Sequence, residues 1–276
     1  MNRVAIIDLG TNTFHLLIAD VDSTGTRLIH KEKKSVKIGE NGISLGIIAQ
    51  PAQERAIHTL QGFKQQVERL EVDQVYATAT SAFRNAANGQ DLAARILAAT
   101  GIKIDIINGE REAYLIYQGV RQALNLGTQN CLIMDIGGGS VEFIIGDHEQ
   151  VKWKHSFEIG AQRLMDKFHH TDPIAVEEIE RLMHYLDDEL APLSSAMELY
   201  GPKLLVGASG TFDTLSLIYC TRKGLETSDR PQQPLTIDGF ENIFQEIIAK
   251  NRAERLAIPG MIEMRVDMIV VASCLI

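Results

Sequence analysis

Two short segments of the chain each place an aspartate, glycine and small hydroxylated residues between apolar runs. The first runs from Asp8 through Gly10 and Asn12 to Thr13, and the second is Asp135-Ile136-Gly137-Gly138-Gly139-Ser140. Glycine lets a turn bring its backbone N–H groups close to an anion, and Thr and Ser hydroxyls add further donors. An aspartate at a strand end is a ligand for a hydrated divalent cation that shields phosphate charge. Both segments therefore predict phosphate binding.

The two segments are parts of an internal repeat. Residues 132–147 align without a gap on residues 5–20, so that Asp135 falls on Asp8, Gly137 on Gly10 and Ser140 on Thr13. Such a repeat predicts two halves built on the same plan, with the two glycine turns facing each other. A single Asp-Leu-Gly turn is common in hairpins. Two copies favour binding of a polyphosphate from both sides over a duplicated hairpin without a ligand.

Three further stretches carry candidate residues. Ser81 and Arg84 follow a strand, where α/β proteins bind ligands, and arginine suits bidentate phosphate recognition; a solvent-facing arginine is the alternative. A third glycine-rich turn contains Gly207, Ser209 and Gly210, whose amides could meet a phosphate at a helix start. A tight turn without a ligand explains it nearly as well. Glu112 lies in a first helical turn, where an acidic residue is an ordinary partner of the helix dipole.

Strands alternate with helices in both halves, which predicts an α/β fold. The boundary is expected near residues 124–130, giving domains 1–124 and 125–276. Expected strands cover residues 4–7, 14–19, 26–36, 75–80, 102–107, 132–147 (as a hairpin), 152–157 and 204–206. Expected helices cover residues 51–70, 91–100, 110–124, 160–168, 174–190, 212–219, 237–249 and 261–276, with a polar loop at 221–234.

Composition excludes several classes of protein. The chain has 276 residues, 45% hydrophobic and 23% charged, which is typical of a globular protein. Its net charge of −9 makes duplex nucleic acid a poor partner. The three cysteines show no metal or disulfide spacing, and no apolar run reaches the roughly 20 residues of a membrane helix. We therefore expect a cytoplasmic protein without a membrane partner. No P-loop motif occurs, and Glu142 stands where a dinucleotide fingerprint needs glycine.

Four ordered motifs resemble the exopolyphosphatase/guanosine pentaphosphate phosphatase family. They are residues 7–13, 79–86, 111–117 and 135–142, and the later segments 207–211 and 265–267 also resemble family motifs. The resemblance covers nearly the whole chain. It implies the superfamily of actin, heat-shock chaperones and sugar kinases, with two ribonuclease-H-like lobes and a cleft between them.

The resemblance also implies roles for particular residues. Glu112 matches the glutamate that activates water, and Arg84 matches the phosphate-binding arginine. Asp135 and Glu142 match acidic residues near a divalent cation, expected to be Mg²⁺. Asp8, at the end of the corresponding first strand, is a further expected metal ligand. Phosphate-binding residues are expected to be Gly10, Asn12, Thr13, Ser81, Arg84, Gly137, Gly138, Gly139, Ser140, Gly207, Ser209 and Gly210.

The implied function is a phosphohydrolase that releases terminal orthophosphate from polyphosphate or guanosine pentaphosphate. An ATP-binding kinase or ATPase of the same superfamily and a non-catalytic sensor of phosphorylated alarmones are the alternatives, and a homodimer stays open. Val141 stands where threonine is usual, and Arg111 where many members have a second glutamate. The helical C-terminal domain of long members is not expected. Short polyphosphate or guanosine pentaphosphate is therefore the expected substrate, with no strong preference for long polymers.

Overall fold

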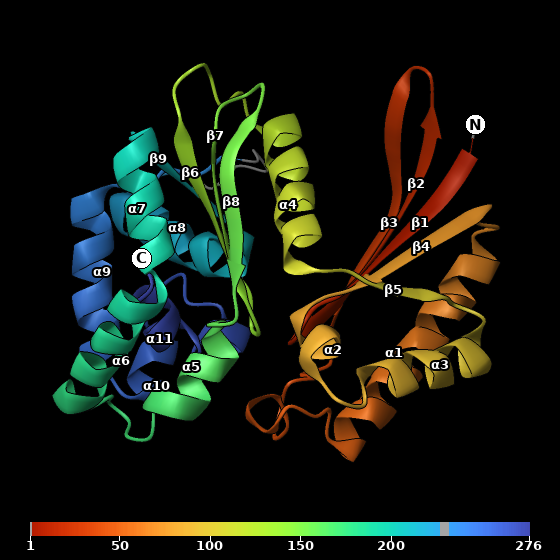
Figure 1. The fold of residues 1–276 in the computed structure, drawn as a ribbon, viewed down its shortest axis with the longest axis horizontal. Coiled ribbons are helices and arrows are strands. Elements are labelled where there is room, and N and C mark those ends of the chain that lie inside the picture. The colour runs from red at the N-terminus through yellow and green to blue at the C-terminus, as the bar shows by residue number, and fades with distance from the viewer. Residues whose placement is uncertain (1, 227–231) are drawn as a thin grey trace. The chain divides into compact units, whose positions relative to one another are not determined.

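The computed structural model describes residues 2–226 and 232–276, so part of the expected loop at 221–234 lies outside the described residues. The chain divides into two compact units, Met1–Gly109 and Glu110–Ile276. Figure 1 draws the first unit in red to yellow and the second in yellow-green to blue. Each unit contains one β-sheet with helices packed against it, which confirms the predicted α/β class.

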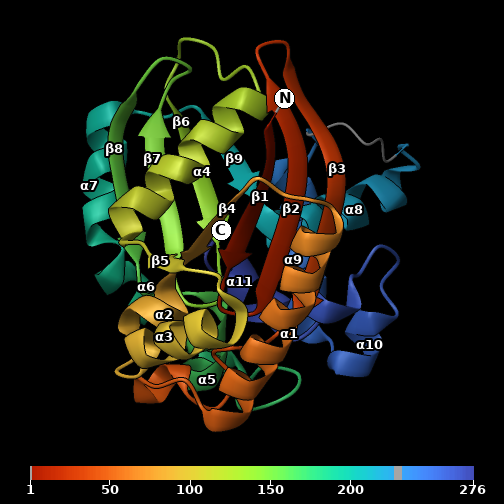
Figure 2. The same ribbon diagram turned by 90° about the vertical axis from the view of Figure 1, so that its right-hand side faces the viewer.

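The first unit has a five-stranded sheet in the order β3-β2-β1-β4-β5. Strands β1 to β3 are antiparallel, as Figure 2 shows, whereas β4 and β5 run parallel to β1. Along β1, Ala5, Ile7 and Leu9 are fully buried and alternate with more exposed residues, the period of two expected for a strand. The buried face packs against α1 and α3. The elements are β1 (Asn2–Leu9), β2 (Thr13–Asp22), β3 (Gly25–Ser35), η1 (Ile43–Leu45), α1 (Gln50–Arg69), β4 (Gln74–Ala79), α2 (Ser81–Asn85), α3 (Gly89–Thr100) and β5 (Ile104–Ile106).

The second unit has a four-stranded sheet in the order β8-β7-β6-β9. Every residue of β7 is buried, because apolar clusters cover both faces of the sheet. The strands are β6 (Cys131–Ile136), β7 (Val141–Gly146), β8 (Val151–Phe157) and β9 (Leu204–Ala208). The helices are α4 (Gly109–Ala123), α5 (Ala161–Phe168), α6 (Val176–Glu189), α7 (Ala191–Tyr200), α8 (Ser209–Lys223), α9 (Ile237–Ala249), α10 (Arg252–Leu256), η2 (Glu263–Arg265) and α11 (Ile269–Ser273).

The two sheets confirm the internal repeat. In each unit, three antiparallel strands are followed by a crossover to a strand parallel to the first, so β6, β7, β8 and β9 correspond to β1, β2, β3 and β4. The sequence alignment places Asp135 on Asp8 and Glu142 on His15. The pairing agrees, because Asp8 lies opposite His15 and Asp135 lies opposite Glu142.

Helix α4 groups with the second unit, which differs from the expected boundary between residues 124 and 125. Its buried residues Ala113 and Tyr117 pack against Ile133 and Ile144 of the second sheet. The Tyr117 hydroxyl also donates a hydrogen bond to the Asp147 carbonyl at 2.9 Å. Helix α4 therefore belongs to the second unit because it packs on β6 and β7, although the loop-like residues that follow it suggested a boundary there.

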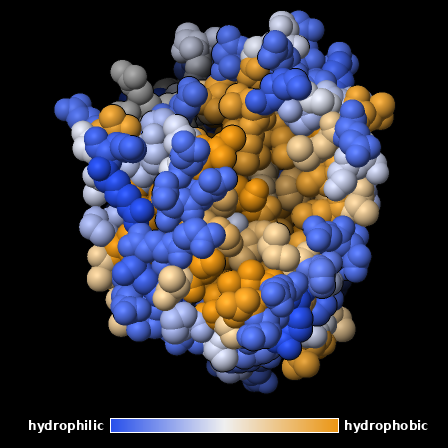
Figure 3. Space-filling view, turned by 90° about the vertical axis from the view of Figure 1, so that its left-hand side faces the viewer, coloured by the Kyte–Doolittle hydropathy of each residue, from blue (hydrophilic) through white to orange (hydrophobic). Residues whose placement is uncertain are grey.

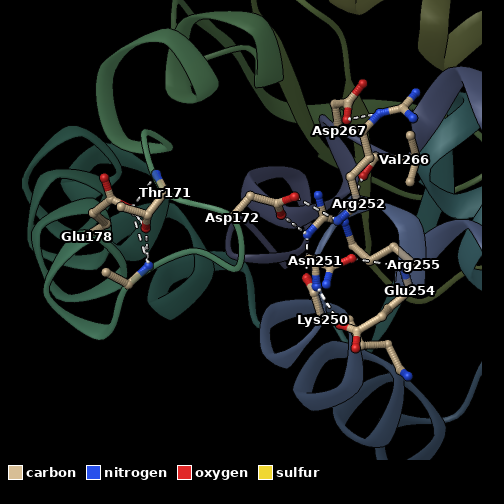
Figure 4. A network of polar contacts seen from close by, with 11 residues as sticks. Thr171, Asp172, Glu178, Lys250, Asn251, Arg252, Glu254, Arg255, Val266 and Asp267 are labelled. Carbon is tan, nitrogen blue, oxygen red and sulfur yellow. Dashed lines mark hydrogen bonds and ion pairs between the residues drawn. The ribbon is translucent and has the colours of Figure 1, made fainter.

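The expected continuous helix over residues 261–276 is wrong. The segment forms the short 3₁₀ turn η2 and the separate helix α11. The buried side chain of Arg255 donates from Nε to the Val266 carbonyl at 3.0 Å, so this carbonyl is engaged from outside the segment. Figure 4 shows Arg255 between Asp172, Lys250 and Val266. Helices α2, α7 and α10 were not expected, and α8 extends to Lys223 into the expected polar loop.

Apolar side chains gather in a hollow on one face of the molecule, as Figure 3 shows. Val176, Leu199 and Ile237, on three helices of the second unit, are 65%, 74% and 77% exposed. Exposed apolar surface of this kind is typical of a contact region. Among the described residues, no helix is both long and apolar enough to cross a membrane.

We predict that Asp20 makes the stability of the first unit depend on acidity. Its carboxylate accepts hydrogen bonds from Arg3 at 2.7 Å and Arg27 at 2.9 Å, and these bonds lower its pKa from 3.8 to about 2. The contribution is present above the unfolded pKa and is lost as pH falls through the folded pKa. The variant Asp20→Asn should lower the urea midpoint at neutral pH, measured by circular dichroism.

The difference from wild type should shrink as the pH falls from about 4 to about 2. The exposed Asp105→Asn change is the control, and it should leave the midpoint near wild type. An Asp20→Asn effect of equal size at every pH would contradict this account.

Candidate active site

The glycine turn of the second unit joins β6 to β7. The Gly137 amide donates to the Ser140 carbonyl at 3.0 Å and closes the turn. The carbonyls of Gly137, Gly138 and Gly139 accept backbone bonds from Ala161, Gln162 and Gly160 at 2.9, 2.9 and 3.2 Å. In a trans peptide, the carbonyl of one residue and the amide of the next point in opposite directions. The amides of Gly138, Gly139 and Ser140 therefore point away from this helix start.

The corresponding turn of the first unit has the same closing bond, from Gly10 to Thr13 at 3.1 Å. Its carbonyls are engaged differently, by the loop after β3. Thr11 accepts from Gly39 at 3.2 Å, and Asn12 accepts from Val36 and Lys37 at 3.0 and 2.9 Å. By the same peptide geometry, the amides of Asn12 and Thr13 point away from that loop. In each unit the amides of the turn thus point one way and the carbonyls of the same peptides point the other way. An anion can accept from such amides without meeting a carbonyl oxygen.

Three carboxylates gather beside the turn of the second unit. Asp135 and Glu142 are direct cross-strand partners, and Glu112 lies in the first turn of α4. The Glu142 side chain is 2% exposed and accepts a hydrogen bond from the Ser156 hydroxyl at 2.7 Å. Burial, and then the charges of Glu112 and Asp135, raise the pKa of Glu142 well above its usual 4.5. The sequence predicted all three carboxylates but not Ser156.

Asp135 also faces the start of α8. Burial raises the pKa of the Asp135 carboxyl. A hydrogen bond with Ser209 and the charge of Arg265 lower this pKa, but the effect of burial is larger. The Ser209 hydroxyl lies 3.3 Å from the Ile136 carbonyl, and Ser209 has a φ of 67°. The predicted residue Ser209 is therefore brought to Asp135. Arg265 was not a predicted site residue, although the motif at 265–267 signalled its segment.

Gly207 and Gly210 lie against the side chains of Phe212 and Arg265. A methyl group at Gly207 would overlap the Phe212 ring, and one at Gly210 would overlap the Arg265 guanidinium. Burial lowers the pKa of Arg265, while the charges of Asp213 and Asp135 raise it. The third turn thus brings a guanidinium next to Asp135. Phosphate binding by Gly207 and Gly210 stays a prediction.

The predicted residues of the first unit lie at the ends of its strands. Asp8 is exposed near the end of β1, between His15 and Thr78 of the adjacent strands. Ser81 begins α2 and is 1% exposed; its hydroxyl accepts from Asn85 at 3.2 Å. The Arg84 guanidinium donates to the Ile107 carbonyl at 3.1 Å. Its side chain is therefore held at the sheet edge where the prediction placed it.

Two acidic residues of the second unit offer oxygen ligands for a divalent cation. Within residues 2–226 and 232–276, no group of three or more His, Cys, Asp or Glu is placed to hold a metal ion together. Mg²⁺, however, keeps several waters and is usually bound by one or two carboxylates with substrate phosphates. Asp135 and Glu142 supply two hard oxygen ligands on adjacent strands in a like-charge cluster. The donor set fits a water-mediated Mg²⁺ site, and magnesium stays a prediction.

Comparison with known proteins defines the class. Residues 17–276 match the Ppx/GppA phosphatase family, and the chain belongs to this family. A solved exopolyphosphatase from Cytophaga hutchinsonii ATCC 33406 is 43% identical, over 99% of this chain and 88% of that one, with a TM-score of 0.94. The Aquifex aeolicus member of the Ppx/GppA family is 25% identical over 99% and 88%, with a TM-score of 0.77. Exopolyphosphatase 1 of Mycobacterium tuberculosis is 29% identical over 98% of this chain and 79% of its own length.

We predict that the variant Glu142→Gln is more stable than wild type at neutral pH. The folded pKa of Glu142 is raised, so ionisation of this group costs stability as the pH rises above the unfolded value near 4.5. Glutamine keeps the acceptor for Ser156 without the buried charge. The thermal midpoint of the variant should exceed that of wild type, by a margin that grows between about pH 5 and pH 8.

The exposed change Glu180→Gln is the control, and its thermal midpoint should follow wild type at each pH. If the thermal midpoint of Glu142→Gln at pH 8 is equal to or lower than that of wild type, ionisation of the buried Glu142 does not destabilise the folded protein, and the prediction is wrong.

Proposed function

We propose that the protein hydrolyses the terminal phosphoanhydride bond of polyphosphate or guanosine pentaphosphate and releases orthophosphate. The observation that carries the proposal is local to the second unit. A turn with three amides pointing one way lies between the strands that carry Asp135 and Glu142, and Glu112 contributes to the same electrostatic cluster. Anion donors and a carboxylate base are thus available to one substrate. The exopolyphosphatases similar to this chain support polyphosphate as the substrate class.

Glu112 is the proposed general base. A carboxylate accepts a proton from water, and the oxygen of that water attacks the terminal phosphorus. The bond from phosphorus to the bridging oxygen breaks, and the shortened chain leaves with the electron pair. Burial and the charges of Glu112 and Asp135 raise the pKa of Glu142, and a cation bound at Asp135 and Glu142 would favour the ionised form of Glu142.

The backbone amides stabilise charge during the transfer. In phosphoryl transfer, the protein acts mainly by positioning and electrostatics, since charge spreads over the equatorial oxygens of the phosphorus. The amides of Gly138, Gly139 and Ser140 are proposed donors to these oxygens, and those of Asn12 and Thr13 are proposed donors in the first unit. Arg84 and Arg265 are proposed to add cationic donors.

Asp135 and Glu142 are the proposed holders of Mg²⁺ in the second unit, and Asp8 occupies the matching position in the first. When bound, the ion would neutralise charge on the substrate phosphates. The two carboxylates would determine where the ion is held, and the hydrogen bond from the Ser156 hydroxyl orients the Glu142 carboxylate.

Charge pairing argues against a preference for long polyphosphate. Lys152 forms an ion pair with Asp147 at 3.6 Å, and Lys154 forms one with Glu110. Among the clustered lysines Lys31, Lys33, Lys34 and Lys37, Lys34 pairs with Glu32 at 3.0 Å. These carboxylates offset the two lysine clusters that a long polyanion would need. We therefore propose similar activity on short and long polyphosphate.

We predict that Glu112→Gln lowers kcat by a factor on the order of 10²–10⁴, the usual contribution of a general base. The amide keeps the size of the side chain and cannot accept the proton. Steady-state phosphate release measures kcat and KM. The matched control is Glu110→Gln, two residues earlier on α4 and paired with Lys154, which should retain most of its kcat. A raised KM with near-normal kcat for Glu112→Gln would move the role of base to another group, first Glu142.

The function is tested by orthophosphate release from tripolyphosphate, long polyphosphate, guanosine pentaphosphate and ATP, each with Mg²⁺ and with EDTA. We expect release with Mg²⁺, almost none with EDTA, and little rise of kcat/KM with polymer length. ATP should be the poorest substrate.

Full activity after exhaustive chelation would contradict the metal assignment. A kcat/KM that climbs steadily to hundreds of phosphates would contradict the charge argument. Binding of the nucleotide without hydrolysis would favour an alarmone sensor instead.

A further inference from the structure

The glycine turn of the second unit is held by one helix start and one side chain. Besides three backbone bonds from residues 160–162, the Arg163 guanidinium donates from Nε to the Gly139 carbonyl at 2.8 Å. A carbonyl oxygen has two lone pairs, so Gly139 accepts from both Gly160 and Arg163. Four donors therefore engage three consecutive carbonyls on one side of the turn.

This arrangement decides where the turn amides point. The Gly139 carbonyl and the Ser140 amide are parts of one planar peptide, so a donor that fixes the carbonyl also fixes the amide in the opposite direction. If the Gly139 carbonyl rotated forward, its partial negative charge would meet the phosphate in place of the Ser140 amide. The charge-assisted bond from Arg163 is stronger than a bond between neutral groups and resists that rotation.

Residue 160 must be glycine because of its close contact with the turn, and not because of its backbone conformation. Its φ of −60° and ψ of 157° are open to any residue. A methyl group there would overlap the carbonyl carbons of Gly138 and Gly139. Only glycine lets the chain before α5 approach the turn closely enough for its amides to reach the three carbonyls.

Helix α5 itself is firmly anchored. Leu164 and Phe168 are 1% and 7% exposed in the core cluster of the second unit, and α5 packs against α11. The Glu158 carboxylate also orients Arg163, because its Oε2 atom lies 3.4 Å from Nη2 of the guanidinium. In the first unit the corresponding carbonyls are held by loop amides, so the arginine is a feature of the second turn.

We propose that Arg163 and Gly160 are positioning residues for the reaction, which hold the carbonyls of residues 137–139 so that the amides of residues 138–140 face the substrate phosphate. This role rests on the proposed function. Neither residue touches the substrate, and both act through the backbone of the turn.

The test measures tripolyphosphate binding by calorimetry in a Glu112→Gln background, where turnover is slow, and KM and kcat in the otherwise unchanged protein. Arg163→Met should weaken binding and raise KM about tenfold or more, the value of one hydrogen bond from a charged donor. Arg163→Lys should restore part of the affinity, because an ammonium can still donate to Gly139. Gly160→Ala should weaken binding at least as much.

Matched controls separate positioning from stability. Arg181→Met, at an exposed position of α6, and Gly62→Ala on α1, where a methyl group meets open space, should bind like the parent. The thermal midpoint of Arg163→Met should stay close to that of Arg181→Met while its affinity falls.

Three outcomes overturn the proposal. If the parent binds tripolyphosphate and Arg163→Met binds it equally well, the positioning role fails and the proposed function stands. If affinity and thermal midpoint fall together without rescue by lysine, Arg163 is structural only. A parent that does not bind tripolyphosphate overturns both the function and the positioning role.

Discussion

The register between β6 and β7 is the constraint on which the candidate site depends. It pairs Asp135 with Glu142 and Ile136 with Val141, which leaves the four-residue turn between them. A shift by one residue would exchange the two faces of β7 and move Glu142 to the opposite side of the sheet. The apolar clusters on both faces resist such a shift, because each contains residues of β6 and β7. Burial of strand side chains therefore fixes the position of the carboxylates.

That register also concentrates negative charge where it is costly. Glu142 is buried next to Asp135 and near Glu112, and its raised pKa measures the cost of ionising it there. Such a cost is typical of a site kept for function at the expense of stability. Hydrogen bonds with the hydroxyls of Ser156 and Ser140 offset part of it. A divalent cation bound at Asp135 and Glu142 would offset more.

The two units share a plan but differ in chemistry. Where the second unit has Glu142 opposite Asp135, the first has His15 opposite Asp8. The second turn has three glycines held by α5 and Arg163, and the first has hydroxylated residues held by a loop. The acidic cluster is therefore a property of the second unit, whereas Ser81 and Arg84 belong to the first.

Local sequence patterns were enough to predict most of the fold and part of the site. Alternation in β1, the ungapped repeat and the glycine turns are encoded over a few neighbouring residues, so the strands, the equivalence of Asp8 with Asp135 and the turn residues could be predicted. The four ordered motifs indicated the family and marked Glu112 as a candidate base.

Only the tertiary structure decided which distant groups meet. Helix α4 joins the second unit because Ala113 and Tyr117 find their apolar partners there, and the helix expected at 261–276 is divided where buried Arg255 engages the Val266 carbonyl. Ser156, Arg163 and Arg265 reach the site from segments without a local signal of their role, apart from the family motif at 265–267. Periodicity describes which face of an element is apolar, whereas a hydrogen bond between residues far apart in the chain depends on how those faces pack.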